Sequence, residues 1–378
     1  MKIGIITILR VNNYGAELQA YATQKALQLL GYQAEIIDYL FYKNPAHIKT
    51  ALSAPTVKAS LIKRIKEFLF PLITKWKAKN SRANALRNTR FEAFHGTHTR
   101  TSKQYRSYDE LKIAELDYDV LISGSDQVWN PGNHTSLDPY FLFFASKAAK
   151  KIAYASSFGV SQIPAGARSY YARALSKYNA IGVREDTAVE LVRDLSGKEA
   201  QLVLDPTLLL TPEEWLKVAT PVERCPDSPF LLIYELGNIP YIKQFALHVA
   251  KQTGMRIVRL CQSASPEGSD KDIVNITDAG PSEFLYLFNK ATLILTNSFH
   301  GTAFSLNFGK QFYTIIPAAK NNNARQKSIL KLCKCEDRSI EENSPYPELI
   351  EYDIKTVQDI LHIERAKSFS FIKEAIEV

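Results

Sequence analysis

Short apolar runs alternate with amphipathic stretches along most of this chain, and that alternation restricts its possible folds more than any other feature. The runs at 2–8 and 34–39 flank a helical stretch at 16–30, which ends at Gly31. Two parallel strands joined by a crossover helix form a βαβ unit. Repetition of this unit gives parallel sheets with helices on both faces. The sequence therefore predicts an α/β protein.

The strand-like runs fall into two series that are separated near residues 206–212. Further runs of the first series lie at 118–124, 151–157, 179–185 and 201–206, and the second series lies at 229–236, 255–260, 291–297 and 311–317. A chain of 378 residues is longer than one core usually spans. We predict two Rossmann-like domains facing a cleft, at 1–210 and 211–350, and a C-terminal helix within 351–378 that packs back across the first domain. No G-x-G-x-x-G motif indicates a dinucleotide.

The positive charge of the chain is concentrated in one segment, at about 43–106. This segment holds 15 lysines and arginines and two acidic residues, so its charge of +13 exceeds the +8 of the whole chain. We interpret it as a basic helical insertion in the first domain. Within it, residues 57–79 have the spacing of a basic amphipathic helix. Such a helix packs on its own domain, lies on an anionic membrane surface or binds another polyanion. A nucleic acid partner is disfavoured, because the segment lacks interleaved aromatic residues suited to base stacking.

Polar residues follow several of the predicted strands, and the crevice beyond the carboxyl ends of parallel strands is where ligands bind. One such loop leads into a helix whose free amides can meet an anion or a sugar hydroxyl. A second follows the strand at 118–124 and combines short polar side chains with a tryptophan, which suits a sugar. The alternative for this second loop is a polar turn with the tryptophan as a core anchor. The acceptor-binding candidates are Asn13, Tyr14, Gly15, Ser125, Asp126, Gln127, Trp129 and Asn130.

Cationic residues follow two other strands. Arg184 comes directly after an apolar strand, where a guanidinium can hold a carboxylate or a phosphate with two parallel hydrogen bonds. His300 follows the strand at 291–297 and either caps a helix or faces a ligand. Together with Lys320 and Arg325, these residues suit a small dianion or trianion. The four cysteines indicate neither a disulfide framework nor a zinc site, so we expect no metal and a cytoplasmic location.

An ordered set of motifs adds a family resemblance. "NYGAELQAYA", "SGSDQVWN", "ASSFG", "VRED", "VLDPTLLL" and "TNSFHGTAFSLNFGKQF" together closely resemble the polysaccharide pyruvyl transferase family. The resemblance covers about residues 3–330 without the basic insertion. It implies a GT-B-like fold and transfer of pyruvate from phosphoenolpyruvate to a sugar as a cyclic ketal, without a further cofactor. It also implies roles in donor binding and catalysis for Arg184, His300 and a downstream cation, for which Lys320 is the best match and Arg325 the next.

The chemistry of this reaction assigns further roles. His300 is the natural proton carrier near neutral pH. Asp126 is the candidate for orienting or deprotonating the acceptor hydroxyl, while Ser298 and Gly301 complete the donor site. We expect an acceptor within a cell-surface polysaccharide, such as a capsule or exopolysaccharide, or on a lipid-linked oligosaccharide at the inner face of a membrane, which 57–79 could contact. The alternatives are a GT-B glycosyltransferase that uses a nucleotide-sugar and a non-catalytic carbohydrate-binding protein.

Overall fold

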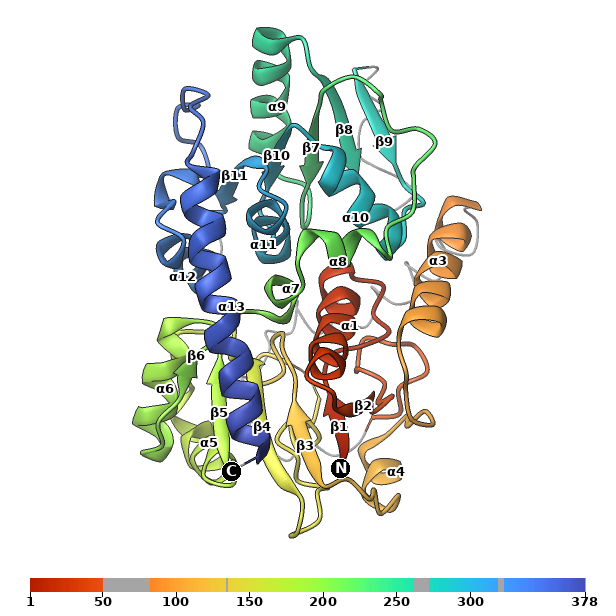
Figure 1. Ribbon diagram of the computed structural model, residues 1–378, viewed down its shortest axis with the longest axis vertical. Helices are drawn as coiled ribbons and strands as arrows, with labels where there is room; N and C mark the ends of the chain where they lie inside the picture. Colours follow the sequence, from red (N-terminus) through yellow and green to blue (C-terminus); the bar gives the residue numbers. More distant parts are fainter. Residues whose placement is uncertain (50–81, 134, 262–271, 319–322, 378) are drawn as a thin grey trace. The chain divides into compact units, whose positions relative to one another are not determined.

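The computed structural model describes residues 1–49, 82–133, 135–261, 272–318 and 323–377 (Figure 1). These residues form two compact units. One is drawn from Met1–Thr74, Gly96–Leu210 and Glu364–Val378, and the other from Lys75–His95 and Thr211–Ile363. Each unit contains a parallel sheet of six strands, so the predicted α/β architecture with two Rossmann-like sheets is confirmed.

The first sheet has the strand order β2-β1-β3-β4-β5-β6. Its strands are β1 (Lys2–Ile6), β2 (Gln33–Ile36), β3 (Val120–Ser123), β4 (Lys150–Ser156), β5 (Ala180–Val183) and β6 (Gln201–Leu202). The helices of this unit include α1 (Tyr14–Leu29), α4 (Tyr108–Lys112), α5 (Arg168–Leu175), α6 (Asp186–Ser196) and α7 (Pro206–Leu209). Every pair of neighbouring strands is parallel, as the crossover connections require.

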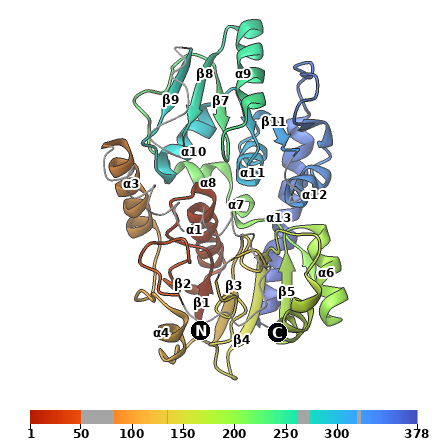
Figure 2. The same ribbon diagram turned by 180° about the vertical axis from the view of Figure 1, so that it is seen from behind.

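Alternate residues along the strands of the first sheet pack against helices and loops on opposite faces of the sheet. Ile122 and Ile152 line a small apolar cavity together with Leu27 of α1 and Ile372 of the C-terminal helix α13 (Ile354–Glu377). Figures 1 and 2 show α1 and this part of α13 on the same face of the sheet. The intervening residues, such as Leu121, belong to a large aromatic cluster on the other face. This period of two is what a strand buried on both faces produces.

The second sheet has the strand order β12-β11-β10-β7-β8-β9. Its strands are β7 (Phe230–Tyr234), β8 (Arg256–Leu260), β9 (Ile273–Ile276), β10 (Leu293–Thr296), β11 (Gln311–Ile316) and β12 (Ser339–Glu341). Its helices include α8 (Pro212–Leu216), α9 (Pro240–Thr253), α10 (Pro281–Lys290), α11 (Phe299–Asn307) and α12 (Ala324–Leu332). Successive strands are added in one direction from β7 to β9 and in the opposite direction from β10 to β12, so the strand order reverses between the neighbours β7 and β10. Open α/β sheets bind ligands at such a position. β9 and β12 were not predicted, because such short edge strands carry little periodicity.

The basic segment and the C-terminal helix differ from the predicted arrangement. Helix α3 (Arg82–His98) runs through the end of the segment, and its residues up to His95 group with the second unit. The reason is Arg90, whose guanidinium pairs with Asp278 and Glu283 of that unit. α13 is likewise shared, since residues up to Ile363 group with the second unit and later ones with the first.

The structure does not test the predicted membrane contact. The amphipathic helix expected at 57–79 lies outside the described residues. Among the helices that are described, none is long and apolar enough to cross a membrane.

Candidate functional site

Arg184 follows β5 at the carboxyl edge of the first sheet and is the centre of a buried charge network. Its Nη1 donates hydrogen bonds to Asp205 Oδ2 at 2.6 Å and to Ser125 Oγ at 3.2 Å, and its Nη2 donates to Asp126 Oδ1 at 3.1 Å. Glu185 approaches Nε at 3.8 Å. Burial alone would lower the pKa of this guanidinium, but Asp205, Asp126 and Glu185 together raise it. Arg184 therefore stays charged and fixed.

This environment differs from the one expected for an anion clamp. The Arg184 side chain is 0% exposed and its guanidinium faces three carboxylates. In this structure the guanidinium therefore does not present two N–H groups to a ligand. The difference arises because Asp205, which follows the neighbouring strand β6, occupies the position that a ligand carboxylate would take. The geometry instead makes Arg184 a positioning residue for Asp126.

Asp126 combines partial exposure with a strained backbone. Its φ of 71° lies in the left-handed region, which costs a non-glycine residue about 1–3 kcal/mol. A parallel bridge to Ser156 and hydrogen bonds from Ser157 N and Val128 N to its carbonyl hold it there. Its side chain is 18% exposed, in contrast to Asp205 at 0%. Asp126 is thus a carboxylate of this network that can meet a ligand.

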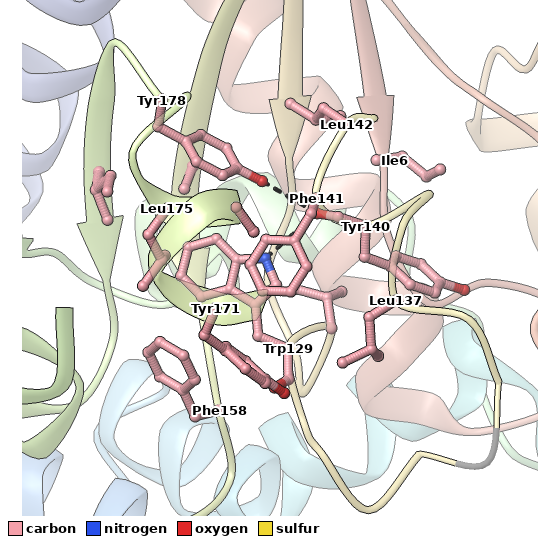
Figure 3. Packing of buried hydrophobic residues seen from close by; sticks show 14 of the residues in the cluster. Ile6, Trp129, Leu137, Tyr140, Phe141, Leu142, Phe158, Tyr171, Leu175 and Tyr178 are labelled. Carbon is pink, nitrogen blue, oxygen red and sulfur yellow. Dashed lines mark hydrogen bonds between the residues drawn. The ribbon is translucent and has the colours of Figure 1, made fainter. Parts of the chain in front are cut away.

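Trp129 does not face a ligand, and its interpretation as a sugar-stacking residue is wrong. The side chain is fully buried, stacks on Phe141 with ring centroids 5.3 Å apart, and donates from Nε1 to the carbonyl of Tyr140 at 3.3 Å (Figure 3). The alternative, a polar turn with a core tryptophan, is correct. Tyr14 and Ser125, also predicted to bind the acceptor, are buried as well. A single sequence does not show which face of a turn an aromatic ring takes.

Several of the predicted acceptor residues remain partly exposed. Gln127 Oε1 accepts a hydrogen bond from Asn130 Nδ2 at 2.5 Å. Gly159 of the next loop packs against both, since a Cβ there would lie 2.3 Å from Gln127 Oε1. Asn13 accepts a hydrogen bond from Ala16 N at 3.1 Å and so caps α1 next to Gly15. Of the predicted acceptor residues, Asp126, Gln127, Asn130 and Asn13 thus keep some exposed surface.

The second unit carries a separate cluster at the carboxyl end of β10. His300 is the second residue of α11, and its ring lies 5.2 Å from the ring of Phe299. Arg325, the second residue of α12, places its Cζ 5.6 Å from the same Phe299 ring. Gln326 Nε2 donates to Asn297 O at 3.4 Å, so the first turn of α12 is joined to the loop that precedes α11. The structure thereby brings His300 and Arg325 to one place.

The start of α11 is shaped by a close contact with β10. A Cβ on Gly301 would lie 2.1 Å from Thr296 Oγ1, so only glycine fits here without displacing the strand. Ser298 N donates to Thr296 Oγ1 at 3.0 Å, and the Ser298 side chain forms no capping bond with any described residue. First-turn amides lack intrahelical acceptors, and the helix dipole is positive at this end. The first turns of α11 and α12, with Arg325, therefore combine groups that suit an anion, although His300 and Arg325 are buried in this structure. Lys320 lies outside the described residues.

Comparison with known proteins gives the family. The model of the family described as polysaccharide pyruvyl transferase matches residues 13–317. The chain belongs to the polysaccharide pyruvyl transferase family. No curated protein matches it.

Solved structures resemble this family member at low identity. The UDP-GlcNAc 2-epimerase from Methanocaldococcus jannaschii is 11% identical with a TM-score of 0.48, over 97% of this chain and 93% of that one. Arabidopsis thaliana UGT89C1 complexed with quercetin is 12% identical with a TM-score of 0.43, over 100% and 94%. E. coli heptosyltransferase WaaC with ADP is 11% identical with a TM-score of 0.41, over 96% and 100%.

Sequence reasoning missed Asp205, which is the partner that fixes Arg184 in this pyruvyl transferase family member. Asp205 also accepts hydrogen bonds from Ser125 Oγ at 2.8 Å and from Thr207 N and Oγ1 at 3.0 and 2.7 Å. The available signal was an aspartate directly before Pro206, which is typical of a helix N-cap. Within the described ranges, no group of three or more His, Cys, Asp or Glu residues could hold a metal ion.

Proposed function

We propose that this protein transfers pyruvate from phosphoenolpyruvate to two hydroxyls of one sugar, as a cyclic ketal with release of phosphate. The observation that carries the proposal is the pairing of His300 and Arg325 around Phe299, at the first turns of α11 and α12. Phosphoenolpyruvate has a phosphate and a carboxylate, so it needs positive charge, and its reaction needs a proton donor. The membership in the polysaccharide pyruvyl transferase family supports the same reaction.

The reaction has three steps. A proton adds to the methylene carbon C3, and an acceptor hydroxyl attacks C2 and loses its proton. The bond from C2 to the phosphate oxygen then breaks, and phosphate leaves with its electron pair. A second hydroxyl of the same sugar attacks C2 and loses its proton, which closes the ketal. No oxidant or reductant takes part, because one phosphoenolpyruvate and one diol give one ketal and one phosphate.

Residues of the two units take different roles in this proposal. His300 gives the proton to C3, and the first-turn amides of α11 and α12 with Arg325 and Lys320 hold the phosphate and the carboxylate. Asp126 accepts the proton of the acceptor hydroxyl, and Arg184 and Asp205 keep Asp126 in place. The acceptor is a sugar of a cell-surface polysaccharide or of a lipid-linked oligosaccharide, modified in the cytoplasm.

The test is phosphate release from phosphoenolpyruvate with a panel of nucleotide-linked, lipid-linked and aryl sugars. We expect release that depends on one class of sugar, with the mass of pyruvate added to that sugar. His300→Ala should reduce turnover by about 100-fold or more, as loss of a general acid does. His362→Ala is the matched control, because His362 is an exposed histidine of α13. Absence of phosphoenolpyruvate binding, together with binding of a nucleotide-sugar, would favour a glycosyltransferase instead.

A further inference from the structure

The described part of the basic segment places five cations on the first unit. Residues 43–49 and 99–106 contain no acidic residue. All of their lysines and arginines have exposed side chains. We refer to these five residues as the basic edge: Lys43, Lys49, Arg100, Lys103 and Arg106.

Backbone contacts hold the two segments of the basic edge side by side. β2 is the last strand of its sheet, and the chain continues from it as an extended segment. A parallel bridge joins Tyr39 of that segment to Tyr105. Further along, Ile48 N donates to Arg106 O at 2.8 Å. The two segments that carry the cations are therefore joined by backbone contacts, and their cations lie on one surface.

The charge of the basic edge is little compensated. Arg106 approaches Glu110 at 3.8 Å, but both side chains are exposed and such pairs attract weakly. The nearby Asp38 is buried and accepts hydrogen bonds from Arg10. Among the described residues, no acidic side chain pairs with Lys43, Lys49 or Lys103. The surface thus has several positive charges that are available to an anionic partner.

The neighbouring side chains indicate the kind of partner. Ile48 is 45% exposed and directly precedes Lys49. Tyr105 is buried, and Tyr42 lies between Lys43, 5.7 Å from its ring, and Phe41, 4.5 Å from it, so neither ring is well placed to stack on a nucleic acid base. Cations beside an exposed aliphatic side chain suit anionic headgroups with an apolar layer beneath them. We propose that the basic edge docks the first unit on an anionic lipid bilayer.

This inference is independent of the transfer reaction and is tested without it. The full chain is sedimented with sucrose-loaded vesicles of phosphatidylcholine alone or with 30 mol% phosphatidylglycerol, a composition chosen as roughly that of an anionic leaflet. The first variant combines Lys43→Gln, Lys49→Gln and Lys103→Gln. Its matched control combines Lys251→Gln, Arg256→Gln and Lys331→Gln, three exposed cations of the second unit. Residues 57–79 are identical in both variants, so their own contribution cancels from the comparison.

The expected result is binding to the anionic vesicles that falls with added salt. The first variant should lose about 100-fold in affinity, at about 5-fold for each cation near an anionic surface, and the control variant should bind like the wild type. Ile48→Ser should weaken vesicle binding and leave binding to heparin unchanged. Equal losses in both triple variants would overturn the proposal, as would binding to heparin without binding to vesicles. The first variant should keep its melting temperature, which separates lost docking from lost folding.

Discussion

Replacing Asp205 with asparagine should destabilise the first unit by about 3–5 kcal/mol, the usual cost of removing one partner from a buried ion pair. The substitution preserves the volume of the side chain and removes its charge. Asp205 Oδ2 accepts from Arg184 Nη1 at 2.6 Å and from Ser125 Oγ at 2.8 Å, while Oδ1 accepts from Thr207. Because the asparagine amide carries one acceptor oxygen, one of these two sets of donors must meet an NH₂ group instead. Arg184 is 0% exposed, so water does not replace the lost carboxylate.

The measurement is urea denaturation followed by circular dichroism at neutral pH. Asp194→Asn is the control, because Asp194 pairs with Arg168 at 2.8 Å with both side chains exposed, and such pairs contribute less than about 1 kcal/mol. A double-mutant cycle with Arg184→Met should give a coupling energy of about 2 kcal/mol or more, since methionine removes the charge that Asp205 compensates. Equal effects of the substitutions at 205 and 194, or no coupling to 184, would refute the view that Asp205 fixes Arg184.

Three further predictions concern single residues. Burial raises the pKa of Glu235 above its unfolded value, so its contribution to stability is present at low pH and is lost as the pH rises through the folded pKa. Glu235→Gln should therefore flatten the fall in stability between pH 4 and pH 7, as measured by urea denaturation, while the lost pairing with the buried Arg259 lowers stability at neutral pH. Gly301→Ala should lower stability by about 1–3 kcal/mol, because its methyl group would overlap Thr296, and thermal melting checks this. Trp129→Phe should cost about 1–2 kcal/mol of stability with an unchanged KM for the acceptor, whereas a sugar-stacking role would raise that KM several-fold.

The positions of the polar strand ends could be predicted from the sequence, but their partners could not. Asp126 and His300 directly follow apolar runs, and the structure puts both at the carboxyl edge of a sheet, as the periodicity indicated. Arg184 was expected to face a ligand because it directly follows an apolar strand. Its compensation comes from Asp205, which lies 21 residues away and follows the next strand. Side-chain pairing across strands depends on register, and one sequence does not specify register.

Trp129 and α3 show the same limit at the level of packing. A tryptophan in a polar turn is compatible with a ligand site or with a hydrophobic core. The stacking of Trp129 on Phe141 shows that this tryptophan belongs to the core. The assignment of Arg82–His95 to the second unit depends on Arg90 meeting Asp278 and Glu283, nearly 200 residues away.

The sequence alone determined the features that come from local periodicity and motif order: the parallel sheets, the crossover helices and the family. These follow from short-range patterns, because a buried strand or an amphipathic helix has to show its apolar face in every few residues. The tertiary structure alone decided which cation is buried, which carboxylate stays accessible and which aromatic ring belongs to the core. Those outcomes depend on contacts between residues far apart in the chain, where burial and charge compensation are properties of the packed structure rather than of any segment.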